Sequence, residues 1–277
     1  MGALLGPMGG LVELHGNASL QVSADSRNTY RRYLSGRVQS QRGPRPRKTW
    51  SASIATATPQ ETALLKQLSA LPHTATTAGL VWYDELAQVS NILSEDVSLL
   101  VPSHWTGSAG MVGGAGMTAD GVLYTRSVTA PPSSTITLGQ AGRQVFAVPS
   151  QRTIRVNAYG TTYEAGTGTL TVEELDPEMA VVASWSSTLA AGRTGSRITR
   201  KITTNVRTVG IRIKLTGFNA IMLPQVTLTD DLMPWSVGLG AQSVAVDITG
   251  EDVQRAVKYG SFWDRRSSIS YTITELN

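Results

Sequence analysis

Cysteine is absent from this sequence of 277 residues. A chain without cysteine has no disulfide framework, no thiolate metal site and no thiol nucleophile. Histidine is almost as scarce, because only His15, His73 and His104 are present and none of them lies at metal-ligand spacing from another. We therefore expect no metal site and no cofactor.

The motifs of common hydrolases and nucleotide-binding enzymes are missing too, including the G-x-S-x-G nucleophile elbow and the Walker A loop. One acidic cluster, formed by Glu173, Glu174, Asp176 and Glu178, lies around Pro177. Glycosidase carboxylates must face each other across ~5–10 Å of a cleft. These residues instead fit a turn between strands, with acids that are solvated or bind Ca²⁺. The sequence therefore predicts a protein that is not an enzyme.

Long apolar runs are lacking as well. No stretch approaches the ~20 apolar residues of a membrane-spanning helix. Residues 1–14 have no basic region before their apolar residues, and glycine and proline interrupt them, which argues against a secretory signal. We expect a protein that is made in the cytoplasm and has no membrane span.

Acidic residues are missing from residues 27–48, which contain eight basic ones. Without these eight of the 24 basic residues, 16 remain against 20 acidic residues, so the positive net charge is local. Such a segment faces an acidic protein surface, solvent or nucleic acid. Nucleic acid is the least favoured partner, because the loop 41–48 has no aromatic residue for base stacking. The candidates for docking on an acidic partner are Arg37, Arg42, Arg45, Arg47 and Lys48.

The clearest structural signals lie between residues 49 and 72. Trp50, Ala52 and Ile54 alternate with polar residues, which predicts a strand with one buried face. Thr58 is a suitable N-cap, followed by proline and, three residues after the cap, by Glu61. Leucines then recur at helical spacing until Pro72, so a short helix is expected here.

Residues 122–230 predict a β-sandwich, most consistent with a jelly roll. Apolar residues alternate with polar ones in short runs such as 153–158 and 209–215, and Gly-rich turns separate the runs. The preceding residues 102–121 are rich in glycine and serine and are expected to form a linker or a long loop.

The remaining segments suggest how the parts connect. We expect residues 1–10 to be a flexible or docking arm, residues 11–22 a hairpin, and residues 86–100 an extended passage. The tail is too short for a core of its own, so the alternating strand around Tyr271 should return to the N-terminal domain.

The predicted fold is therefore mainly β. A split N- and C-terminal β domain with one short helix, residues 1–100 completed by residues 235–277, carries an inserted jelly-roll sandwich at residues 101–234.

Four aromatic residues of the sandwich region are candidates for contact with a glycan: Trp105, Tyr159, Tyr163 and Trp185. Aromatic rings can pack on sugar faces. Packing in the core or at its rim is the favoured alternative for these residues.

Several segments carry a resemblance to a known family. They are Leu34-Ser35-Gly36-Arg37-Val38, Arg47-Lys48-Thr49-Trp50, Ala57-Thr58-Pro59-Gln60-Glu61, the run from Val81 to Asn91, and the closing Ser270 to Leu276. Together they resemble the minor tail proteins of long-tailed phages infecting actinobacteria, which are similar to distal tail proteins. The resemblance covers residues 11–98 and 240–277.

This resemblance implies a structural virion protein at the tail tip, assembled in the host cytoplasm. Distal tail proteins form a ring, usually a hexamer, that joins the tail tube to the tip and carries an outward β-sandwich. Its implied partners are other copies of the chain and the neighbouring tube and tip proteins. The alternative is a glycan-binding adhesion module that recognises a host surface.

Overall fold

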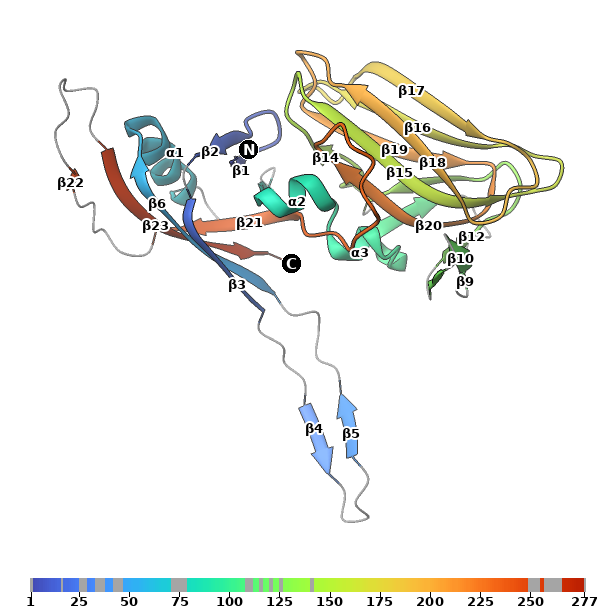
Figure 1. Cartoon of the computed structure of the whole chain (residues 1–277), viewed down its shortest axis with the longest axis horizontal. Coiled ribbons are helices and arrows are strands. Elements are labelled where there is room, and N and C mark those ends of the chain that lie inside the picture. The colour runs from blue at the N-terminus through green and yellow to red at the C-terminus, as the bar shows by residue number, and fades with distance from the viewer. Residues whose placement is uncertain are drawn as a thin grey trace. The chain divides into compact units, whose positions relative to one another are not determined.

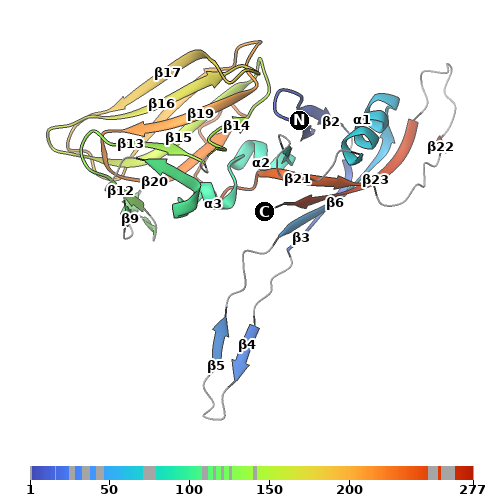
Figure 2. The same ribbon diagram turned by 180° about the vertical axis from the view of Figure 1, so that it is seen from behind.

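A computed structural model describes most of the chain. The described residues are 2–15, 17–24, 29–32, 38–41, 47–70, 79–107, 112–114, 117–119, 122–124, 127–139, 142–248, 255–256 and 266–276. The chain divides into two compact units (Figures 1 and 2), the first made of Met1–Ala3, Glu13–Trp82 and Gln242–Asn277, the second of Leu4–Val12 and Tyr83–Ala241.

An eight-stranded sheet brings the two ends of the chain together. Its strands are β1 (Ala3–Gly6), β2 (Val12–Leu14), β3 (Asn17–Ala24), β6 (Lys48–Ala57), β7 (Leu80–Tyr83), β21 (Ala241–Asp247), β22 (Arg255–Ala256) and β23 (Arg266–Glu275). Their order is β2-β1-β7-β21-β23-β6-β3, and β22 also pairs with β23. Because β23 lies between β21 and β6, the predicted return of the tail to the N-terminal part is confirmed.

The register of β6 and β23 explains why these strands are stable. Trp50 is opposite Ile273 and Ala52 is opposite Tyr271, and all four side chains are buried. Alternate residues of a strand point to one face, so the apolar set of each strand joins a single core. The rings of Trp82 and Tyr271 pack in a T-shaped arrangement, with their centroids 6.4 Å apart. The predicted strands at 49–54 and 269–273 are confirmed.

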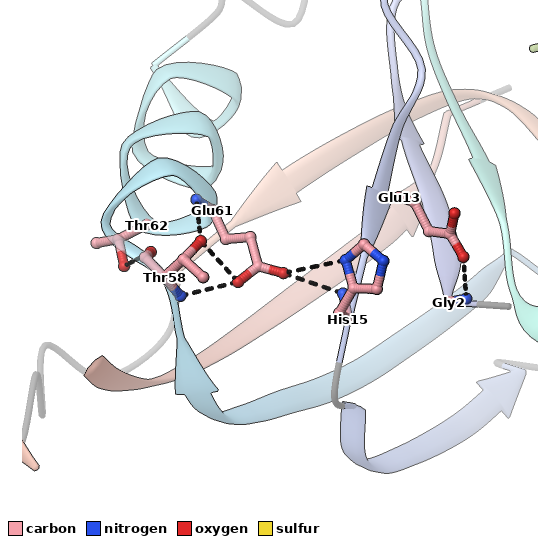
Figure 3. Close-up of polar contacts among 6 residues, drawn as sticks. All are labelled: Gly2, Glu13, His15, Thr58, Glu61 and Thr62. Carbon is pink, nitrogen blue, oxygen red and sulfur yellow. Dashed lines mark hydrogen bonds and ion pairs between the residues drawn. The ribbon is translucent and has the colours of Figure 1, made fainter. Parts of the chain in front are cut away.

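Helix α1 (Pro59–Ser69) begins with the predicted capping box (Figure 3). The Glu61 N–H donates to Thr58 Oγ1 at 3.1 Å, and the Thr58 N–H donates to Glu61 Oε2 at 2.8 Å. These bonds satisfy two donors that a helix start otherwise leaves open. Leu65 and Leu68 are buried, as their helical spacing predicts.

The second unit contains the predicted sandwich. One sheet has the order β18-β15-β20-β12-β9, from β9 (Val112–Gly114), β12 (Ser127–Thr129), β15 (Thr153–Thr162), β18 (Ser196–Thr203) and β20 (Phe218–Thr227). The other has the order β17-β16-β19-β13-β8, from β8 (Trp105–Gly107), β13 (Thr135–Leu138), β16 (Gly168–Leu175), β17 (Val181–Leu189) and β19 (Gly210–Thr216), with β14 (Phe146–Ala147) paired to β19. Buried residues of both sheets, among them Val156 and Val172, form the core. The mainly β fold with an inserted sandwich is thus confirmed.

Two short ladders complete the described strands. β4 (Thr29–Arg32) pairs with β5 (Val38–Gln41), and β10 (Met117–Ala119) pairs with β11 (Val122–Tyr124).

Residues 86–100 are helical, so the expected extended passage is wrong. Helix α2 (Glu85–Ser90) is capped by Asp84, and helix α3 (Glu95–Ser98) is capped by Ser94. Both helices contact β20, and the Ile92 N–H donates to the carbonyl of Val226 at 2.9 Å. These contacts group residues 83–100 with the sandwich, whereas the sequence-based division placed them in the first domain.

Three other local predictions are also wrong. Residues 3–6 form the buried strand β1 inside the sheet instead of a flexible or docking arm. β2 and β3 lie at opposite ends of the sheet order and do not form a hairpin with each other. Within the predicted linker, Pro102–His104 is the 3₁₀ helix η1, and β8 pairs with β13 of the sandwich. Between residues 249 and 265, only β22 lies among the described residues.

Candidate functional site

Trp185 is the most exposed of the aromatic candidates. It lies on β17, the end strand of its sheet, and 37% of the residue is accessible to solvent. Its indole Nε1–H donates to Glu174 Oε1 at 2.6 Å. The polar atom of the side chain is therefore satisfied within the protein, while part of the residue remains at the surface.

Glu174 is a buried anchor beneath Trp185. Only 1% of it is exposed, and its second oxygen, Oε2, accepts hydrogen bonds from the Asn205 N–H at 2.7 Å and from Thr208 Oγ1 at 2.5 Å. A buried carboxylate is costly unless such donors surround it. Glu174 therefore ties the edge strand to the turn at residues 204–208.

The predicted solvated acidic turn is consequently wrong in two respects. Glu173 and Glu174 belong to strand β16, and Glu174 is buried together with Asp176. Asp176 Oδ1 accepts from the N–H groups of Glu178 and Ala180, and its Oδ2 accepts from the Arg207 guanidinium. These donors come from the folded chain, and the run of acids in the sequence does not reveal them.

Arg200 contacts the Trp185 ring, and Val206 belongs to the turn that Glu174 holds. The Arg200 guanidinium, from the other sheet, lies 5.4 Å from the ring centroid, within cation–π range. Val206 is in the turn that Glu174 holds, and 65% of it is exposed. We call Trp185, Glu174, Arg200 and Val206 the Trp185 rim.

The other predicted glycan contacts do not converge on this rim. Tyr159 is 2% exposed and its ring is covered by Arg197, so it is a core residue. The hydroxyl of Tyr163 donates to the carbonyl of Ala130. Trp105 is half-buried on β8, at the opposite end of the sheet from β17.

The predicted docking residues are only partly described. Arg37, Arg42 and Arg45 lie outside the described residues. Arg47 is exposed, and Lys48 is half-buried at the start of β6. The role of this basic segment stays a prediction.

A second surface is apolar and belongs to β3, the end strand of the eight-stranded sheet. Leu20 is 39% exposed and Val22 is 57% exposed. Their cross-strand partners on β6 are Ala52 and Trp50, which are both buried. Opposite residues of an antiparallel pair point to the same face of the sheet. The apolar side chains of this face are therefore buried on β6 and exposed to solvent on β3. We call Leu20 and Val22 the β3 strip.

The histidines in the described part of the chain are each paired with one carboxylate. Across the described residues, no group of three or more His, Asp or Glu side chains could hold a metal ion. His15 is paired with Glu61 at 3.8 Å (Figure 3), and His104 is paired with Asp96 at 3.7 Å.

No helix in the described part of the chain is long and apolar enough to cross a membrane.

Comparisons with known proteins give structural likeness alone. No family model and no curated protein matches the sequence. Among solved structures, the enzymatically active domain of bacteriophage CBA120 tailspike protein 4 has a TM-score of 0.39 and 14% identity over 50% of this chain and 21% of its own. The CBM22-1 xylan-binding domain of Paenibacillus barcinonensis Xyn10C has a TM-score of 0.33 and 13% identity, over 52% of this chain and 99% of its own. TmCBM61, in complex with β-1,4-galactotriose, has a TM-score of 0.35 and 15% identity, over 50% of this chain and 99% of its own.

The likeness thus extends over about half of this chain, and this chain spans about a fifth of the tailspike domain. TM-scores below 0.5 are too low for any of these activities to be transferred to this protein.

Proposed function

We propose that this chain is an adhesion protein whose sandwich binds carbohydrate at the Trp185 rim. The observation that carries the proposal is an exposed Trp185 ring whose indole N–H is fixed by the buried Glu174. A side chain that is already held in one orientation loses little conformational entropy when a ligand packs on it. Because the polar atom of the ring is satisfied, its apolar part faces the ligand.

The test is a glycan array together with retention on host cell-wall polysaccharide. We expect Trp185→Ala to weaken binding about tenfold, which corresponds to about 1.4 kcal/mol, and Trp185→Phe to retain part of it. Leu232→Ala is the matched control, because Leu232 is an exposed apolar residue of the same unit outside the rim. Equal binding by Trp185→Ala and the wild type would refute the proposed site.

A second candidate function is that of a structural subunit of a phage tail tip, in the manner of a distal tail protein. The β3 strip favours it. β3 contains no charged residue, although exposed edge strands of soluble proteins usually carry charges that block pairing. An uncovered apolar edge of this kind is suited to association with another strand.

The occupant that we propose for the β3 strip is a second copy of this chain. The sheet ends in β3 on one side and in β2 on the other, and Val12 of β2 is also exposed. Each copy therefore offers two different strand edges, and contacts between unlike surfaces close into a ring when the rotation permits.

Mass measurement of the native assembly tests this second function. We expect an oligomer for the wild type and a shift to monomer for the pair Leu20→Lys and Val22→Lys, with an unchanged far-UV spectrum. Val237→Lys, at an exposed apolar position of the other unit, is the control. A wild type that remains monomeric at the concentrations of assembly would exclude a ring.

Catalysis is not part of either proposal. Purified protein incubated with peptidoglycan or arabinogalactan is expected to release no product, and turnover of either polymer would contradict this.

A further inference from the structure

The solvent-facing side of the six-stranded sheet carries rows of hydroxyl groups. The register aligns one row across five strands, formed by Ser186, Thr171, Lys214, Thr137 and Thr106. The next row on one side consists of four threonines, and the row on the other side contains Ser184, Glu173 and Arg212. All these side chains are partly or fully accessible. We call this surface the open sheet face.

The charged residues of the open sheet face compensate one another. Glu173 Oε2 accepts from Arg212 Nη1 at 3.1 Å, and Glu173 Oε1 accepts from Lys214 Nζ. Their side chains pair along the sheet instead of extending from it as isolated charges. The remaining nine positions of the three rows are serine or threonine, so the surface is shallow, polar and nearly neutral.

The other sheet of the sandwich carries the helical segment. Its strand β20 is buried almost throughout and contacts helices α2 and α3. Asn91 Nδ2 donates to the carbonyl of Pro224, and Gln225 Nε2 donates to the carbonyl of Ser90, so this segment is fixed on β20. One sheet thus supports the helical segment, and the other presents hydroxyl rows to solvent.

We propose that the open sheet face is a second carbohydrate-contact surface, which takes an extended, neutral, hydroxyl-rich polysaccharide. This inference rests on the proposed carbohydrate-binding function but uses different residues from the Trp185 rim. Thr171 and Ser186 share one hydrogen bond at 3.3 Å, and Thr135 and Thr216 share one at 2.9 Å. A hydroxyl can donate one hydrogen bond and accept two, so each of these groups keeps capacity for a sugar hydroxyl. Rows about 6.8 Å apart on strands about 4.8 Å apart make a two-dimensional array that suits a long polymer.

The charge balance identifies the class of polymer. Arg212 and Lys214 exceed Glu173 by a single positive charge, and both cations are already paired with that carboxylate. A polyanion needs several uncompensated cations, whereas a neutral polymer needs only donors and acceptors. No aromatic side chain belongs to these rows, so each sugar unit contributes little and affinity grows with polymer length.

Threonine also favours strands for reasons unrelated to ligands, and the experiment separates the two roles. Thr171→Val and Thr137→Val, made together, remove two hydroxyls while keeping a β-branched side chain of similar shape. Thr203→Val, on an exposed position of the other sheet, is the matched control. Affinity electrophoresis through gels containing arabinogalactan or a soluble β-glucan, with polygalacturonate as the anionic probe, measures binding, and thermal unfolding measures stability.

We expect the double variant to lose about tenfold in affinity for a neutral polymer, with its melting temperature and the control variant unchanged. Loss of binding in Trp185→Ala but not in the double valine variant would overturn this inference and leave the proposed function intact. Loss of binding in the double valine variant but not in Trp185→Ala would support the open sheet face and would contradict the Trp185 rim as a binding site. A wild type that is retarded only by polygalacturonate would overturn the neutral class, and one retarded by no polymer would overturn both sites.

Discussion

Glu61 shows how a single residue can serve two segments that are far apart in sequence. It completes the capping box of α1, and its Oε1 accepts from the His15 N–H at 3.0 Å (Figure 3). Burial raises the pKa of this carboxyl, but the hydrogen bonds from Thr58 and His15 outweigh burial and hold the pKa below its ordinary value of 4.5. The charged form is therefore favoured in the folded protein.

This lowered pKa predicts a dependence of stability on pH. The stabilising contribution of Glu61 is fully present above pH 4.5, the pKa of the unfolded chain, and is lost as pH falls through the lower pKa of the folded state. We expect Glu61→Gln to lower the free energy of unfolding of the first unit by about 1 kcal/mol at pH 7, and by less at pH 3. Thermal unfolding at the two pH values measures this, and a difference that does not change with pH would contradict it.

Glu174 is the corresponding residue of the second unit. Because Glu174 lies in a cluster of four acidic residues, the sequence predicts a solvated turn. The sequence does not show which hydrogen-bond donors the fold brings to this carboxylate. In the structure those donors are Trp185, Asn205 and Thr208, which come from a neighbouring strand and a distant turn. The alternation of the apolar Leu170 and Val172 with Thr169 and Thr171 was a signal that could have predicted the burial of Glu174. If the alternation continues along the strand, residue 174 lies on the same buried face as Leu170 and Val172.

At the scale of elements, the long periodic segments were predictable and the short ones were not. β6, β23 and α1 have eight or more residues with one apolar face, and each forms as expected. Helices α2 and α3 have only six and four residues, too few for a helical period to stand out. Their only local signals are the caps Asp84 and Ser94, and packing against β20 supplies the remaining stability.

The connection between these helices depends on Asn91, which is fully buried. Its Nδ2 donates to the carbonyls of Pro224 and Ser236, and its Oδ1 accepts from the N–H groups of Leu93 and Val226. Removing this side chain leaves buried backbone groups without hydrogen-bond partners. Each such group that water cannot reach lowers the free energy of unfolding by about 1–3 kcal/mol.

We therefore expect Asn91→Ala to lower the free energy of unfolding of the second unit by about 3 kcal/mol or more. Asn91→Asp should cost at least as much, because its second carboxylate oxygen would face the carbonyls of Pro224 and Ser236 without a donor between them. Ser90→Ala is the control, since its hydroxyl donates only to the carbonyl of Leu86 at an exposed position. Chemical denaturation followed by hydrogen exchange at β20 measures the effect, and equal stability of Asn91→Ala and Ser90→Ala would be inconsistent with this role.

At the scale of the whole molecule, the first unit depends on both ends of the chain. β23 has β21 on one side and β6 on the other, so the tail is an interior strand. Without it, Trp50 and Ala52 lose the buried partners Ile273 and Tyr271. The second unit contains no residue after Ala241 and does not share this dependence.

Ile273→Asp is accordingly expected to unfold the first unit while the sandwich stays folded. A charge at this fully buried position has no partner and costs several kcal/mol. Ser270→Asp is the control, because Ser270 is exposed on the same strand. Hydrogen exchange should show lost protection in β6 and retained protection in β15 and β20. Protection lost from both units together would show that they do not unfold independently.

The sequence by itself determined the mainly β class, the strands and helix with a complete period, the capping box, and the return of the tail. These follow from local periodicity and from the need of a short tail to share a core. Only the tertiary structure decided which strands are neighbours, which acids are buried, and which apolar residues remain uncovered. The reason is physical: the burial of Glu174 and the exposure of Val22 depend on groups that the fold brings from distant parts of the chain, or fails to bring.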